Sequence, residues 1–234
     1  AQAQKSLERV VEQLPADQDI PIVVHQSTSI PTGLMELVEE NGASLAVVGS
    51  SSAGLLGRIG LGSVTERLVH TAAVPVAIAP RGYAPGSEPI RMLTAAYGGE
   101  ADVNGLIPAA AELATAWSVP LRIVSFTVRP VGGSIEPTAE NLVVQQWSKR
   151  TFDDIVTKLN AVRERLAVPD GEGAVGSGRD WREAVEAVPW ASGDILLMGS
   201  GAAGPLARVF LGSAASKIVR HVPVPVMIVP RHRK

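Results

Sequence analysis

The sequence predicts an α/β fold made of two tandem units, each a doubly wound parallel sheet. The first observation is a repeat, because residues 45–80 reappear as residues 195–230 at an offset of 150 positions without an insertion. Each copy reads as a strand, a glycine-rich loop, a helix and a second strand. Strand-like and helix-like segments alternate elsewhere too, which implies right-handed crossovers and a parallel sheet. A period this long marks a duplicated domain, since solenoid units have about 20–50 residues.

Each copy of the repeat opens and closes with an apolar strand. Residues 45–48 and 195–198 are apolar runs that end at a glycine, which is typical of a strand covered on both faces. The closing strands, Val74–Ala79 and Val224–Ile228, contain a proline, which cannot donate to a sheet ladder. We therefore expect the closing strands at sheet edges, where they are available to pair with a like edge. The repeats could use them on each other, as a dimer-like pair within one chain, or in self-association.

The helix inside each repeat has its own start signal. Ser63 and Glu66 have the spacing of a capping box, in which the serine accepts from the backbone and the glutamate reaches back. Ser213 is expected to cap the equivalent helix in the second copy.

The remaining elements follow from periodicity and from glycine and proline stops. A linker is expected at residues 81–89, so the two units are 1–86 and 87–234. The second unit has an opening strand, helix and strand that the first lacks, so we expect either further residues before Ala1 in the natural protein or another segment in their place. Helices are expected at 1–14, 32–40, 102–117, 138–168 and 180–188, and strands at 20–24, 91–97, 121–126 and, weakly, 174–175.

The two glycine-rich loops are the candidate functional sites. A strand that leads through such a loop to a helix start presents free N–H groups to an anion. The alternative is that small residues only let the loop pass close to the sheet. Arg58 and Arg208 recur at equivalent positions and are either phosphate ligands or exposed loop charges. The candidate residues are Gly49, Ser52, Arg58, Gly62 and Ser63 in the first copy and Gly199, Ala202, Arg208, Gly212 and Ser213 in the second.

The loop spacing resembles the signature of the universal stress protein family. That signature is a glycine, two residues, a glycine, nine residues and then Gly-Ser or Gly-Thr. Gly49 to Ser63 and Gly199 to Ser213 keep the total spacing, but the internal glycine is Ser52 in one copy and Ala202 in the other. The resemblance extends over both repeats and implies a tandem member with a stress-response role.

The resemblance also implies a five-stranded parallel sheet in each unit and, in one subgroup, ATP binding. In that subgroup an aspartate at the end of the opening strand lies beside the adenine. In the second unit this place falls at Tyr97 or Gly98, neither of which is a carboxylate. We therefore expect degenerate nucleotide loops, no cofactor, and a binding or regulatory module. The alternative is a universal stress protein that senses adenine nucleotide by binding ATP.

Composition and residue types narrow the class of protein. The net charge of −2 disfavours a nucleic-acid binder, and the absence of cysteine excludes disulfides and thiolate catalysis. No apolar run is long enough to span a membrane and none reads as a signal peptide, so a cytoplasmic protein is expected. The histidines lack the spacing of metal ligands, and the serines after Gly49 lack the sequence of a nucleophile elbow. The carboxylates expected to be solvated are Asp153, Asp154, Glu183 and Glu186. No enzyme activity is expected.

Overall fold

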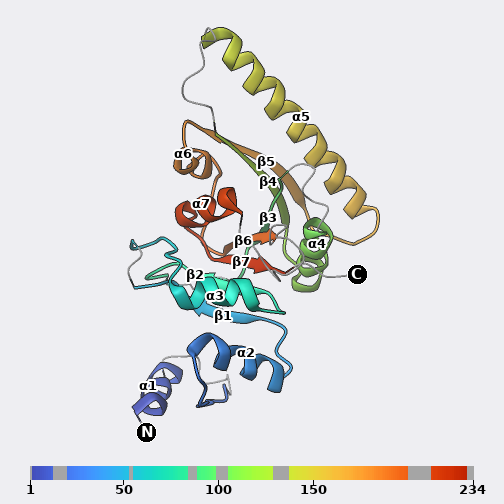
Figure 1. The fold of residues 1–234 in the computed structure, drawn as a ribbon. Helices are drawn as coiled ribbons and strands as arrows, with labels where there is room; N and C mark the ends of the chain where they lie inside the picture. Colours follow the sequence, from blue (N-terminus) through green and yellow to red (C-terminus); the bar gives the residue numbers. More distant parts are fainter. Residues whose placement is uncertain are drawn as a thin grey trace. The chain divides into compact units, whose positions relative to one another are not determined.

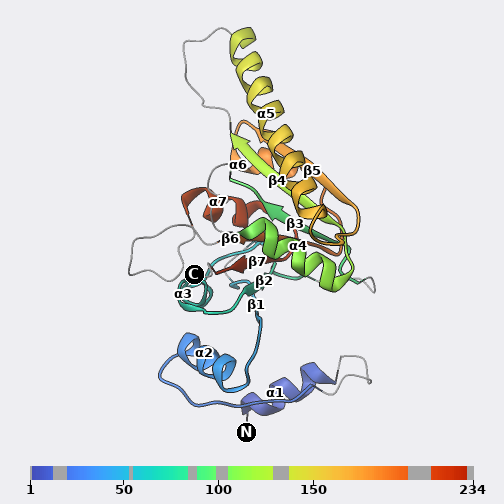
Figure 2. The same ribbon diagram turned by 90° about the vertical axis from the view of Figure 1, so that its right-hand side faces the viewer.

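The computed structural model describes residues 2–12, 20–52, 55–83, 89–98, 105–128, 137–199 and 212–230. It contains two compact units, Ala1–Ala43 and Ser44–Lys234. Figures 1 and 2 show the ribbon in two views.

The smaller unit contains two helices, α1 (Gln2–Val11) and α2 (Ile30–Glu40). The Ser29 side chain caps α2 by accepting from the Thr32 amide at 3.3 Å. The strand expected at residues 20–24 is wrong, because these residues form no strand. In the second copy, the equivalent strand, Gly171–Gly178, pairs with Leu121–Val128, whereas residues 20–24 take part in no ladder. An isolated strand has no ladder partner and does not form.

The larger unit is built on one seven-stranded sheet with the order β1-β2-β7-β6-β3-β4-β5. Every neighbouring pair is parallel except β2 and β7, which are antiparallel. The mostly parallel α/β sheet expected from the sequence is therefore present. The strands are β1 (Ala46–Gly49), β2 (Val76–Ala79), β3 (Met92–Ala96), β4 (Leu121–Val128), β5 (Gly171–Gly178), β6 (Asp194–Gly199) and β7 (Val226–Val229).

The two closing strands pair with each other, which confirms the expected dimer-like pairing of the repeats within one chain. Val76 is opposite Ile228 and Ile78 is opposite Val226 in the ladder. The prolines are compatible with a position inside the sheet. Each comes just before its strand and takes part in hydrogen bonding only through its carbonyl, as an acceptor. The Pro75 carbonyl accepts from Ala46 at 3.0 Å, and the Pro225 carbonyl accepts from Leu196 at 2.9 Å.

Helices cover both faces of the sheet in the larger unit. Figure 1 shows α6 and α7 on one side of the strands and α4 and α5 on the other. Alternation along β3 accounts for this, because Leu93 and Ala95 belong to the cluster that packs under α4 and α5, whereas Thr94 faces the opposite side. The helices are α3 (Ser63–Thr71), α4 (Leu106–Trp117), α5 (Pro137–Arg163), α6 (Trp181–Glu186) and α7 (Ser213–His221).

The expected serine caps are wrong in both repeats. Helix α3 has Gly62 as its N-cap and α7 has Gly212, and neither helix start has a side-chain cap hydrogen bond. Ser63 and Ser213 are the first helical residues, one position too late to cap. The glycines adopt the extended backbone that an N-cap needs but offer no acceptor side chain.

Helix α6 is short and depends on two local supports. Asp180 caps it by accepting from the Glu183 amide at 2.9 Å, and Glu183 accepts from the Arg179 amide at 2.9 Å. The helix also lies directly on β5, because a Cβ built on Gly176 would be 2.2 Å from the Ala184 carbonyl oxygen. Glu183 is thus not merely solvated, contrary to expectation.

No helix within the described ranges is both long enough and apolar enough to cross a membrane.

Replacing Ser118 by glycine is expected to stabilise the protein. Ser118 ends α4 with φ 55° and ψ 41°, a left-handed conformation that costs a residue with a Cβ about 1–2 kcal/mol. The extra freedom of glycine in the unfolded chain offsets part of this gain, by about 0.4–1 kcal/mol. We expect a net rise in the free energy of unfolding of roughly 0.5–1 kcal/mol in urea titration. Ser118→Ala, which keeps the Cβ, should give no gain; equal stabilisation by both variants would contradict the explanation.

Adding a methyl group at Gly176 is expected to destabilise the contact between β5 and α6. The new Cβ would overlap the backbone of α6, which cannot move aside as a flexible side chain can. Overpacking of this kind costs about 1–3 kcal/mol or more, seen as a lower urea midpoint. Gly49→Ala is the control, because a Cβ at Gly49 meets nothing within 4 Å. An unchanged midpoint for Gly176→Ala would show that α6 does not pack this closely.

Acid is expected to weaken the start of α6. Hydrogen bonds from Arg179 lower the pKa of Glu183 from 4.5 to about 2. Because the folded pKa lies below the unfolded one, the stabilising contribution is present above pH 4.5 and is lost as the pH falls toward 2. The melting temperatures of the wild type and Glu183→Gln should therefore differ near neutral pH and converge in acid. A difference that stays constant down to about pH 2 would contradict this.

Candidate functional site

The first glycine-rich loop folds back so that its two ends lie side by side. Gly60 donates its amide to the Ser50 hydroxyl at 2.7 Å, and Ser51 donates its amide to the Gly60 carbonyl at 2.9 Å. A Cβ on Gly62 would be 3.1 Å from the Ser51 Cβ, so the glycine allows this close approach. The Ser50 hydroxyl is thus bound to the loop backbone and is not presented as a nucleophile.

The loop ends at the start of α3, where the helix has no side-chain cap. The first amides of a helix carry a partial positive charge and favour an anion. Ser63 is exposed at this end, and Gly62 adds no side chain in front of the amides. The geometry can therefore accept a phosphate group, and that role stays a prediction.

Arg58 extends from this loop to the second repeat. Its guanidinium donates to the carbonyl of His221 at the end of α7 and to Glu186 Oε1 at 3.3 Å at the end of α6. The side chain is 29% exposed, so it is partly enclosed by these contacts. Glu186 was expected to be solvated; it is exposed, at 47%, and in addition forms this ion pair. A role for Arg58 as a phosphate ligand stays a prediction.

Ser52 stands where the family signature has its internal glycine. The residue is exposed, and within the described part of the chain Ser118 is the non-glycine residue with positive φ. Ser52 therefore carries no left-handed backbone strain in this loop conformation. Any effect of its side chain on a ligand would be steric.

The second loop is described at its two ends. Gly199 closes β6, and a Cβ there would lie 3.7 Å from the Leu106 Cβ at the start of α4. Gly212 precedes α7 and has nothing within 4 Å of a built Cβ. Ala202 and Arg208 lie outside the described residues.

Tyr97 follows β3 at the place where the family resemblance puts a carboxylate. It is buried in the core under α4 and α5, and its hydroxyl donates to Asp154 on α5. The Lys158 ammonium lies 5.3 Å from the centre of the Tyr97 ring, within cation–π range. A carboxylate is thus present near this strand end, supplied by α5, although Asp154 was expected to be solvated.

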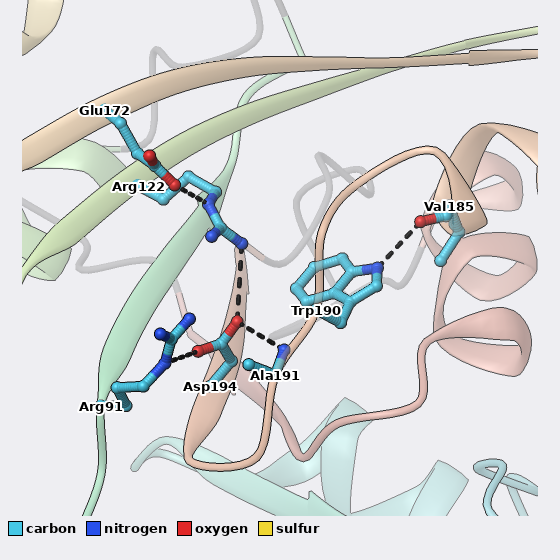
Figure 3. Close-up of polar contacts among 7 residues, drawn as sticks. All are labelled: Arg91, Arg122, Glu172, Val185, Trp190, Ala191 and Asp194. Atoms are coloured by element: carbon cyan, nitrogen blue, oxygen red, sulfur yellow. Dashed lines mark hydrogen bonds and ion pairs between the residues drawn. The ribbon is translucent and has the colours of Figure 1, made fainter.

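Charged side chains also cluster at the amino ends of β6 and β3. Gly199 and Tyr97 lie at the other, carboxyl, ends of these strands. Figure 3 shows the fully buried Asp194 between Arg91, at 3.3 Å, and Arg122, at 3.6 Å. Asp194 also accepts from the Ala191 amide at 3.1 Å, and Glu172 pairs with Arg122 at 2.5 Å. The two positive and two negative charges balance, which is the usual condition for burying ions. We assign this cluster a structural role.

The described residues offer little for catalysis or metal binding. They contain no group of three histidine, cysteine, aspartate or glutamate side chains able to hold a metal. In the smaller unit, His25 lies 2.7 Å from Glu36, and this hydrogen bond lowers the pKa of the glutamate. Both side chains are used in that pair.

Sequence patterns did not reveal two of these contacts. Arg58 and Glu186 are 128 positions apart, and Tyr97 and Asp154 are 57 apart, so no local spacing joins them. The support of α6 was also missed, since Glu183 was expected to be solvated, although Asp180 and Glu183 have the spacing of an N-cap and an N3 glutamate.

Comparison with known proteins covers both repeats. The family model described as "Universal stress protein family" matches residues 1–80 and 93–230. Universal stress proteins of Mycobacterium tuberculosis (strain ATCC 25618 / H37Rv) and Mycobacterium bovis are each 34% identical over 208 residues, or 86% of this chain and 69% of theirs.

Solved structures resemble the fold at lower identity. A universal stress protein from Archaeoglobus fulgidus has a TM-score of 0.53 and 20% identity, covering 86% of this chain and 67% of that one. A protein described as a universal stress protein from Pseudomonas aeruginosa UCBPP-PA14 has a TM-score of 0.56 and 14% identity, covering 98% and 78%. With the family match in both repeats and the parallel sheet with its two loops, these findings identify the chain as a member of the universal stress protein family.

Proposed function

We propose that the protein is a stress-response binding or regulatory module without enzyme activity, whose repeats pair in a dimer-like way and whose nucleotide loops are degenerate. The observation that carries this proposal is the antiparallel pairing of β2 with β7, which joins the two closing strands inside one chain. This pairing supports dimer-like association of the repeats within one chain rather than self-association of separate chains through these strands. A net charge of −2 favours a protein partner over nucleic acid or an anionic membrane surface.

The state of the first loop supports weak nucleotide binding. Its arginine is engaged with the second repeat, and its amides at Ser51 and Gly60 are bonded within the loop. A nucleotide phosphate that needs these groups would have to break those contacts first. ATP-binding members of the family have a glycine at this place, which lets the backbone lie against the phosphates. Ser52 and Ala202 place side chains there instead.

The alternative is an ATP-binding universal stress protein that senses adenine nucleotide. It is favoured by the helix starts at Gly62 and Gly212, which keep amides without a side-chain acceptor. On this alternative the substituted glycines are tolerated, and the phosphates bind at the helix ends. Neither function as proposed includes a reaction.

Calorimetric titration with ATP and magnesium separates the two functions. We expect no measurable binding, or a dissociation constant weaker than about 100 μM, which corresponds to about −5.5 kcal/mol. The variant Ser52→Gly, Ala202→Gly removes both side chains and is expected to bind more tightly if these positions limit affinity.

The controls address the helix starts. Gly62→Asp places a carboxylate before α3 and should abolish any ATP signal from the first loop, since it competes with phosphate for the amides. Micromolar affinity in the unmodified protein, or ATP recovered after purification, would establish the alternative and refute degenerate loops. Release of phosphate from ATP would contradict both.

A further inference from the structure

Arg58 is the point at which the first loop contacts the second repeat. One guanidinium nitrogen donates to the His221 carbonyl, and another lies 3.3 Å from Glu186 Oε1. These acceptors belong to two different helices, α7 and α6, which pack on the same face of the sheet. A single side chain therefore holds two elements of the second unit.

The backbone that carries Arg58 is fixed by hydrogen bonds on both sides. Gly57 donates to the Arg81 carbonyl at 2.8 Å, and Arg81 donates back to the Arg58 carbonyl at 3.0 Å. Ile59, the next residue, is buried, and Gly60 is bonded to Ser50. The arginine consequently cannot shift its main chain without breaking the closure of the loop.

The acceptors are chemically suited to a guanidinium. The last carbonyls of a helix lack intrahelical partners and carry partial negative charge, which a cation at that end stabilises. Glu186 adds a full negative charge beside the His221 carbonyl. An exposed ion pair alone contributes little, but the contact with a backbone carbonyl sets the position of Arg58 against the end of α7.

We propose that Arg58 couples the conformation of the first glycine loop to helices α6 and α7 of the second unit. Closure of the loop through Ser50 and Gly60 holds Arg58 in place, and Arg58 holds the two helix ends. Opening of the loop withdraws the guanidinium and loosens both helices. The coupling rests on the proposed function only for the ligand that would open or close the loop. The contact of Arg58 with α6 and α7 forms without a ligand.

A double-mutant cycle with hydrogen exchange tests the coupling without any ligand. Ser50→Ala removes the acceptor that closes the loop, and Arg58→Ala removes the connection. The amide that reports on α7 is that of Val222, which donates to Ile218 at 3.1 Å. We expect each single variant to speed exchange there by about threefold or more, and the double variant to match Arg58→Ala alone, because coupled residues are not additive.

Matched variants separate coupling from general destabilisation. Arg67→Ala removes an exposed arginine of α3 and should leave exchange at Val222 unchanged. Glu186→Gln keeps the contact between Arg58 and His221 and should speed exchange at Val222 less than Arg58→Ala does. This variant replaces Arg58→Ala in the test if Arg58→Ala does not fold. Unchanged exchange at Val222 in Arg58→Ala overturns the proposal. If Arg58→Ala does not fold, unchanged exchange in Glu186→Gln overturns it instead. Fully additive effects of Ser50→Ala and Arg58→Ala overturn it too.

The outcome is distinguishable from that of nucleotide binding. If ATP binds, it should alter exchange at Val222 in the wild type and not in Arg58→Ala, compared at an ATP concentration that calorimetry shows to saturate both proteins. If ATP does not bind, the mutational cycle still decides the coupling. A change at Val222 on adding ATP that persists in Arg58→Ala would show a different route and overturn the role of Arg58.

Discussion

The antiparallel ladder between β2 and β7 is the interaction on which the rest of the larger unit depends. Val76, Ile78, Val226 and Ile228 face the same side of the sheet from the two repeats and are almost completely buried. These four side chains come from both repeats, so apolar surface of one repeat is buried against the other. Separating the repeats would expose this core and leave two strand edges unpaired, which explains why one sheet joins both copies.

Much of this fold was predictable because the signals are local and repeated. Strand, glycine loop, helix and strand follow one another within 36 positions, and the repeat doubles the evidence for each boundary. The errors arose where structure depends on a neighbour. Residues 20–24 have the composition of a strand but take part in no ladder, and composition alone does not supply a partner.

The candidate site was only partly predictable. The positions of Gly62 and Gly212 at helix starts follow from the loop spacing, whereas their role as caps in place of Ser63 and Ser213 depends on where the helix begins. The partners of Arg58 come from the second unit, and no spacing in the sequence encodes them. Repetition of an arginine at 58 and 208 indicated that the position matters but did not indicate to what it binds.

The reversal of direction between β2 and β7 also sets where each loop opens. Strands β1 and β2 run in one direction, and β7, β6 and β3 run in the other. Gly49 and Gly199 each end a strand, so they lie at opposite ends of the strands in the sheet. A small molecule held at one loop therefore cannot touch the other loop of the same chain. The duplication has therefore placed its two loops so that a substitution in one leaves the space in front of the other unchanged.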